Sequence, residues 1–105
     1  MVAELDFVES VEHARRKGSM LVWIGPEPAD YISGLLGLEP GTMAELKPHV
    51  AMAMDEKEAM AYKDCVFVCY HGRTSKYLAH IMNERHGIRS VSMKGGVAAV
   101  VGEIF

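Results

Sequence analysis

Cysteine is scarce in this chain: Cys65 and Cys69 are the only two among 105 residues. If both lie on one strand, the usual rise per residue separates them by about 13 Å, which is beyond the reach of a disulfide. We therefore expect two free thiols, as in a reducing compartment. Two thiols and scattered histidines also give no reason to expect a bound zinc ion or any other metal.

The sequence also lacks an excess of positive charge and any long apolar run. Its formal net charge is -3, which gives no reason to expect nucleic acid or an acidic membrane as a partner. No apolar run approaches the roughly 20 residues that are needed to cross a bilayer. The start, Met1 to Asp6, lacks the basic and apolar regions of a signal peptide. We therefore expect a cytoplasmic protein that contacts neither nucleic acid nor a membrane.

Candidate strands and helices alternate along the whole chain. Apolar runs predict strands at 20–24, 50–54, 66–69 and 89–93. Periodicity and terminal residues predict helices at 7–17, 28–33, 42–46, 55–62 and 77–86. This alternation predicts a single domain, residues 1–105, of the α/β class, in which a mainly parallel central sheet is flanked by helices in three layers.

Three of the predicted helices begin with a capping pattern, in which Asp or Thr is followed three positions later by Glu. The pairs are Asp6 with Glu9, Thr42 with Glu45, and Asp55 with Glu58. In the first helix we expect the apolar positions Phe7, Val8, Val11 and Ala14 to face the core. The charged stretch 13–17 is expected to be solvated, and Gly18 is expected to end the helix.

The stretch 66–76, VFVCYHGRTSK, is the most informative part of the sequence. Val66 to Val68 predict a buried strand that ends at Cys69, and helical spacing resumes at Tyr77. A loop that closes onto a helix N-terminus points backbone N–H groups inward, and the helix dipole adds partial positive charge. Such surroundings favour the thiolate, which is the nucleophilic form of cysteine. Because ligands bind at the carboxyl ends of parallel strands, Cys69 is a candidate nucleophile.

The two cysteines and Gly72 also have purely structural interpretations. Cys69 could be a small buried hydrophobic residue, although a polar loop containing glycine follows it directly. We expect Cys65 to be such a residue, because it lies among apolar neighbours. Gly72 could serve an ordinary turn, or it could let the backbone approach an anion without interference from a Cβ atom.

The other residues of the loop leave alternatives open as well. His71 and Arg73 could simply be exposed, or they could attract an anionic substrate. Thr74 and Ser75 could cap the following helix and also donate hydrogen bonds to the loop. The loop does not match the Cys-x5-Arg motif of cysteine phosphatases, because Ser75 occupies the sixth position after Cys69 and Arg73 comes two positions too early. Phosphatase activity is therefore not expected.

The string Cys69-Tyr70-His71-Gly72, with Ser75-Lys76 behind it, resembles the active-site loop of the rhodanese-like sulfurtransferases, and most closely that of small single-domain thiosulfate sulfurtransferases. The segment 95–99, GGVAA, resembles the Gly-Gly-x-x-Ala segment of the same family. The piece 27–34, EPADYISG, resembles its segment Glu-Pro-x-Glu-Tyr-x-x-Gly. However, Ile24, Pro26 and Leu35 stand where this family usually has Asp, Arg and His.

The resemblance implies a rhodanese-like fold and a sulfurtransferase that needs no cofactor and no metal. Cys69 would be the catalytic residue and would form a persulfide. The loop residues that would bind the substrate are Tyr70, His71, Gly72, Arg73, Thr74 and Ser75. The implied partners are a small anionic sulfur donor, such as thiosulfate, and a thiol or protein sulfur acceptor. The replacement of the family's Asp, Arg and His favours an alternative, a weakly catalytic or non-catalytic module that carries sulfur for, or binds, a partner protein.

Overall fold

The computed structural model describes residues 2–102. Within this part of the chain, strands β1 (Glu4–Leu5), β2 (Leu21–Trp23), β3 (Met43–Glu45), β4 (Val66–Val68) and β5 (Val91–Met93) form one sheet. The strand order is β1-β5-β4-β2-β3, and every neighbouring pair is parallel. The prediction of an α/β fold with a mainly parallel central sheet is therefore confirmed.

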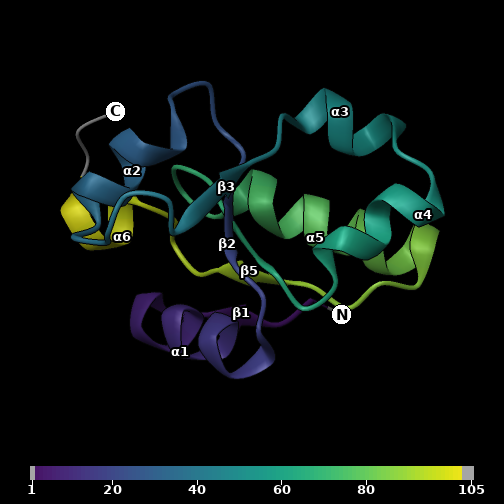
Figure 1. Ribbon diagram of the computed structural model, residues 1–105, viewed down its shortest axis with the longest axis horizontal. Helices are drawn as coiled ribbons and strands as arrows, with labels where there is room; N and C mark the ends of the chain where they lie inside the picture. Colours follow the sequence, from purple (N-terminus) through teal and green to yellow (C-terminus); the bar gives the residue numbers. More distant parts are fainter. Residues whose placement is uncertain (1, 103–105) are drawn as a thin grey trace.

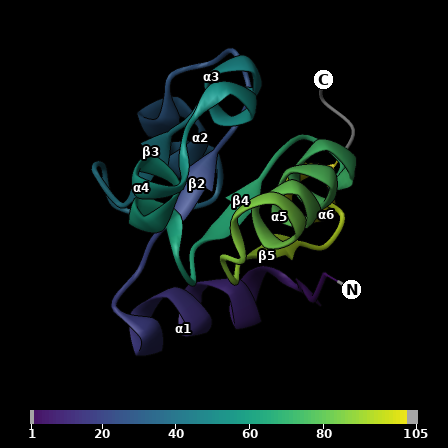
Figure 2. The same cartoon turned by 90° about the vertical axis from the view of Figure 1, so that its right-hand side faces the viewer.

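Helices cover both faces of the sheet (Figure 1). They are α1 (Phe7–Lys17), α2 (Ala29–Leu35), α3 (Pro48–Ala53), α4 (Glu56–Ala59), α5 (Arg73–His86) and α6 (Ala98–Val101). One apolar core joins the sheet to α1, α2 and the start of α6, and the other joins it to α3, α4 and α5. In Figure 2, α5 runs beside β4 and β5, which are the strands that it contacts. The fold thus has three layers.

Two of the three capping patterns do cap a helix, as predicted. Asp6 accepts a hydrogen bond from the backbone N–H of Glu9 at 2.8 Å, and the Glu9 carboxylate accepts one from the backbone N–H of Asp6 at 3.1 Å. The pair Asp55 and Glu58 makes the same two bonds at the start of α4. Each pair satisfies two helix-terminal donors, which explains why α1 and α4 begin where the sequence predicts.

The prediction of a helix from the third pattern, Thr42 with Glu45, is wrong, because residues 43–45 form strand β3. Met43 and Glu45 pair in parallel with Leu21 and Trp23 of β2. The hydroxyl of Thr42 donates to the carbonyl of Glu39 at 2.7 Å instead of capping a helix. The pairing of a whole strand with β2 outweighs a local preference that involves one or two hydrogen bonds.

The prediction of a strand at 50–54 is also wrong, since helix α3 covers Pro48–Ala53. Pro48 lies in the first turn of this helix, where its missing N–H costs nothing. In the run 50–54, Ala51 and Met54 are buried while Val50 is exposed. Buried positions three residues apart are typical of a helix, and the uniformly apolar run concealed this spacing.

Helix α1 places Phe7, Val11 and Ala14 against the core, as predicted, but two of its residues differ from the prediction. Val8 is 73% exposed, whereas His13, placed in the solvated stretch, is buried. The Nε2 atom of His13 lies 3.1 Å from the carbonyl oxygen of Asp64, so that the imidazole has a hydrogen-bond partner just before β4. None of the helices within residues 2–102 is long and apolar enough to cross a membrane.

Candidate active site

Cys69 lies at the carboxyl end of β4, in the middle of the sheet. Its strand pairs with β2 on one side and β5 on the other, so that the ends of three strands surround it. The backbone N–H of Ile24 extends the pairing by donating to the carbonyl of Val68 at 3.0 Å. The run Val66 to Val68 is completely buried, so that the strand is held firmly and carries Cys69 to the edge where ligands bind in parallel sheets.

Two backbone N–H groups point at the sulfur of Cys69. The donor of Gly72 lies 3.1 Å from Sγ, and that of Ser75 lies 3.4 Å from it. Both belong to the start of α5, where N–H groups have no partner within the helix. The helix dipole adds partial positive charge at the same place. This arrangement favours a negative charge on the Sγ atom of Cys69.

Helix α5 begins at Arg73, four residues earlier than the helical spacing predicts. Gly72 is its N-cap residue and no side chain caps the helix, so the prediction that Thr74 and Ser75 serve as caps is wrong. Thr74 is exposed on the first turn. The hydroxyl of Ser75 is buried and lies 3.4 Å from the Sγ atom of Cys69.

A buried serine on the neighbouring strand completes this hydrogen-bonded chain. The hydroxyl oxygens of Ser75 and Ser92 lie 2.6 Å apart, and both residues are fully buried. Ser92 belongs to β5, next to β4. Ser92 was not among the predicted site residues, although a polar residue inside an apolar strand indicates that its hydroxyl has a buried partner. The two hydroxyls connect the sulfur to the sheet and limit the positions that Ser75 can adopt.

The segment Gly95-Gly96 braces the backbone of the loop. A Cβ atom on Gly96 would lie 2.4 Å from the carbonyl oxygen of Cys69, and one on Gly72 would lie 2.8 Å from the nitrogen of Gly95. The backbone N–H of Val97 donates to the carbonyl of Cys69 at 3.0 Å. Only glycine permits this close approach, and the segment thereby fixes the carbonyl of the candidate nucleophile.

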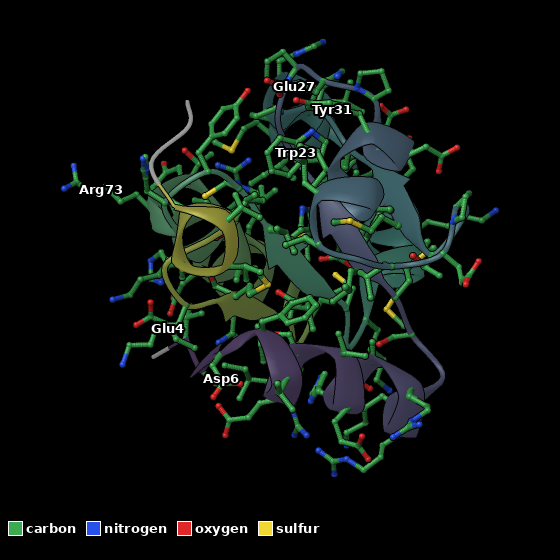
Figure 3. All side chains as sticks on the ribbon, turned by 90° about the vertical axis from the view of Figure 1, so that its left-hand side faces the viewer. Glu4, Asp6, Trp23, Glu27, Tyr31 and Arg73 are labelled. Carbon is green, nitrogen blue, oxygen red and sulfur yellow. The ribbon has the colours of Figure 1, made fainter. Side chains whose placement is uncertain are left out.

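Tyr70 is held by two residues that sequence reasoning did not single out for the site. Its ring packs edge-on against Trp23, with centroids 5.1 Å apart, and its hydroxyl donates to the Oε1 atom of Glu27. The indole N–H of Trp23 in turn donates to the carbonyl of Glu27 at 3.0 Å. Figure 3 shows Trp23 and Glu27 close together, far from Glu4 and Asp6. Burial, followed by the hydrogen bond to the Glu27 carboxylate, raises the pKa of Tyr70 to about 12.

A cavity of about 370 Å³ opens beside the sulfur. It is lined by Cys69, Tyr70, His71, Arg73 and Thr74, which are five of the seven residues that sequence reasoning proposed. Cys69 is only 6% exposed, and it lines this opening. Arg73 projects from the start of α5 away from the body of the protein (Figure 3). A larger hollow of about 790 Å³, lined in part by Lys63 and Arg89, contains none of the proposed site residues.

The other cysteine lies at the opposite end of β4. Cys65 precedes this strand, is 1% exposed and belongs to the apolar core. Burial raises the pKa of its thiol well above the usual value, because the charged form would lie among apolar side chains. Both cysteines are free. Only Cys69 therefore combines a free thiol with N–H donors and an adjoining cavity.

Comparisons of the chain with protein-family models, with curated proteins and with solved structures find no match. The protein is a compact α/β domain with a five-stranded parallel sheet. Its site has one thiol, held by backbone N–H groups at the carboxyl edge of that sheet.

Proposed function

We propose that this protein is a rhodanese-like sulfurtransferase. It moves a sulfane sulfur from thiosulfate or a similar donor through a persulfide on Cys69 to a thiophilic acceptor. The observation that carries this proposal is the convergence of the Gly72 and Ser75 N–H groups on the Sγ atom of Cys69, at 3.1 Å and 3.4 Å. These donors stabilise the negative charge on Sγ when Cys69 is a thiolate, both before it attacks the donor and after the acceptor has taken the sulfur.

The chemistry consists of two displacements at sulfur. The Cys69 thiolate attacks the outer sulfur of thiosulfate, a new S–S bond forms, and the old S–S bond breaks with its electron pair leaving on sulfite. An acceptor such as cyanide or a thiolate then attacks the outer sulfur of the persulfide and releases the Cys69 thiolate. Charge and atoms balance in each step, and no oxidant is needed. Because the enzyme is modified between the two steps, the kinetics should be ping-pong.

The cavity beside the sulfur supports a small anionic donor. Arg73 and His71 line it, and a guanidinium attracts and orients oxyanions by charge-assisted hydrogen bonds. The departing sulfite carries negative charge, which the start of α5 also stabilises. The side chains of Tyr70 and Ser75 have partners within the protein. They therefore shape the loop, whereas Arg73, which projects from the start of α5 (Figure 3), is placed to meet the anion.

A second candidate is a carrier or binding module of the same fold with little activity of its own. One observation favours it. Ile24 and Leu35 supply apolar side chains and Pro26 an exposed ring where the resembled family has charged or polar groups. In this case the donor would be another protein's persulfide rather than thiosulfate.

Mass spectrometry of the intact reduced protein after treatment with thiosulfate tests the proposal. We expect the gain of one sulfur atom and the release of sulfite, followed by loss of that sulfur when cyanide is added. Cys69→Ser should abolish the gain, since a hydroxyl is a far weaker nucleophile at neutral pH. Cys65→Ala is the matched control and should gain sulfur normally, because Cys65 lies in the core.

A folded protein that gains no sulfur from thiosulfate would next be offered a persulfide-loaded cysteine desulfurase. Transfer from that enzyme to Cys69 would support the carrier module. The absence of transfer from both donors, with folding verified by circular dichroism, would refute the sulfurtransferase proposal in either form.

A further inference from the structure

The exposed side of α5 carries a groove that lies next to the active-site cavity. Its volume is about 440 Å³, and Val2, Arg73, Lys76, Tyr77 and His80 line it. The four lining residues of α5 follow a spacing of three and four positions, which places them on one helical face. Arg73 lines both the groove and the cavity beside Cys69. A molecule seated in the groove is therefore close to the entrance of the active site.

The groove combines positive charge with an exposed aromatic ring. Arg73 and Lys76 are cationic, His80 contributes a third basic side chain, and Tyr77 is 56% exposed. The chain as a whole has a net charge of -3, so that this face differs in sign from the average surface. Lys76 pairs with Glu4 at 3.4 Å, and their side chains are 55% and 32% exposed, respectively. Such a pair contributes little and can exchange for another carboxylate.

We propose that this groove binds an acidic segment of a partner protein, and that a cysteine on this segment exchanges sulfur with Cys69. The inference rests on the proposed function. Because Cys69 is nearly buried, a folded partner can reach its sulfur only with a protruding segment. Carboxylates of the segment would pair with Arg73 and Lys76, and an apolar side chain would pack on the ring of Tyr77.

The transfer itself follows the chemistry of the second displacement. The thiolate of the bound segment attacks the outer sulfur of the Cys69 persulfide. The S–S bond of that persulfide breaks, its electron pair returns to Cys69 as thiolate, and the partner's cysteine becomes the persulfide. Docking on α5 raises the effective concentration of the attacking thiolate near the cavity, without adding a group to the reacting atoms.

Two synthetic peptides of equal length, each with one cysteine, test the docking. One is rich in glutamate and the other in lysine. The protein is first loaded with thiosulfate and freed of excess donor, and the loss of sulfur to each peptide is followed by mass spectrometry. We expect faster transfer to the acidic peptide at low ionic strength, and a smaller preference as salt screens the charges.

The substitution Lys76→Gln should lower the preference for the acidic peptide about two- to fivefold, as expected for one exposed charge pair. Lys57→Gln on α4 is the matched control, and it should leave the preference unchanged because Lys57 does not line the groove. The ratio of the transfer rates to the two peptides, taken within each variant, cancels the different intrinsic reactivities of the peptides. Sulfur loading by thiosulfate and removal by cyanide should be the same in both variants and the parent.

The outcomes separate this inference from the proposed function. A parent protein that is never loaded with sulfur refutes the proposed function, and the inference with it. A protein that loads and discharges to cyanide normally, but shows the same peptide preference in the parent and in Lys76→Gln, leaves the proposed function intact and refutes docking in the groove. An equal loss of preference in Lys57→Gln would attribute the effect to overall charge and would also overturn the inference.

Discussion

The substitution Gly72→Ala would test the geometry that holds the sulfur. Gly72 has φ of +88° and donates its N–H to the Sγ atom of Cys69. A Cβ atom there would lie 2.8 Å from the nitrogen of Gly95 and 3.3 Å from the carbonyl oxygen of Met93. Both contacts involve backbone, which cannot rotate away as a side chain can. Alanine at 72 therefore pays for an unfavourable φ and for a steric overlap.

Gly41→Ala separates these two costs. Gly41 has nearly the same φ, +84°, but a Cβ atom there would have nothing within 4 Å. We expect each substitution to lower the free energy of unfolding by about 1–2 kcal/mol because of the left-handed φ. Gly72→Ala alone should lower it by about 1–3 kcal/mol more because of overpacking. With a urea slope of about 1–3 kcal/mol per molar, the extra loss moves the unfolding midpoint of Gly72→Ala about 1 M below that of Gly41→Ala.

Urea unfolding followed by circular dichroism measures the two midpoints. The rate of Cys69 alkylation at neutral pH measures how readily its sulfur reacts as a thiolate. We expect Gly72→Ala to alkylate more slowly than the parent, because moving the loop lengthens the N–H contact that favours thiolate. Gly41→Ala should alkylate at the parental rate. Equal midpoints for the two variants would contradict the close approach of Gly72 to the segment at Gly95, and with it the proposed bracing of the loop.

Three further predictions concern the cysteines, the anion and the tyrosine. Iodoacetamide should label Cys69 much faster than Cys65 at neutral pH, because burial raises the pKa of the Cys65 thiol; peptide mapping after timed labelling decides this, and equal rates would remove the basis for choosing the nucleophile. Arg73→Ala should raise the KM for thiosulfate several-fold, with kcat and the unfolding midpoint nearly unchanged, and parental kinetics would assign anion binding to the backbone alone. The pKa of Tyr70 is raised to about 12, so the folded state favours the neutral phenol relative to an unfolded pKa of about 10. This stabilisation is complete below pH of about 10 and is lost as the pH rises through about 12; a difference titration of phenolate absorbance between the parent and Tyr70→Phe measures it, and ionisation of Tyr70 near 10 would contradict the bond to Glu27.

The sequence by itself determined the features that depend on residues close together in the chain. The apolar run Val66 to Val68, followed by Cys69 and a polar loop, predicted a buried strand with a thiol at its end, and the structure has both. The sequence also correctly predicted the capping pairs of α1 and α4 and the glycine that ends α1. The capping pairs and Gly18 make their hydrogen bonds within or next to their own helix, and the burial of Val66 to Val68 follows from their apolar side chains, so that neighbouring residues carry each of these signals.

Tertiary structure decided everything that depends on distant partners. Residues 43–45 carry a local helix signal, but β2 offers them a complete ladder of hydrogen bonds and they become a strand. Val50 and Met54 belong to an apolar run, and only packing against the sheet shows which positions of the helix are buried. The sequence predicted a solvated His13, but the carbonyl of Asp64, 51 residues away, gives its imidazole a hydrogen-bond partner.

The same division holds within the candidate site. The sequence placed Cys69 and Gly72 in one loop, because they are three positions apart. It could not reveal that Ser92 touches Ser75, or that Glu27 accepts from Tyr70, since 17 and 43 residues separate these pairs. Parallel strands must be joined by long crossover segments, so the residues that meet at their ends come from distant parts of the chain. Pairing of the strands brings them together, and no local pattern records it.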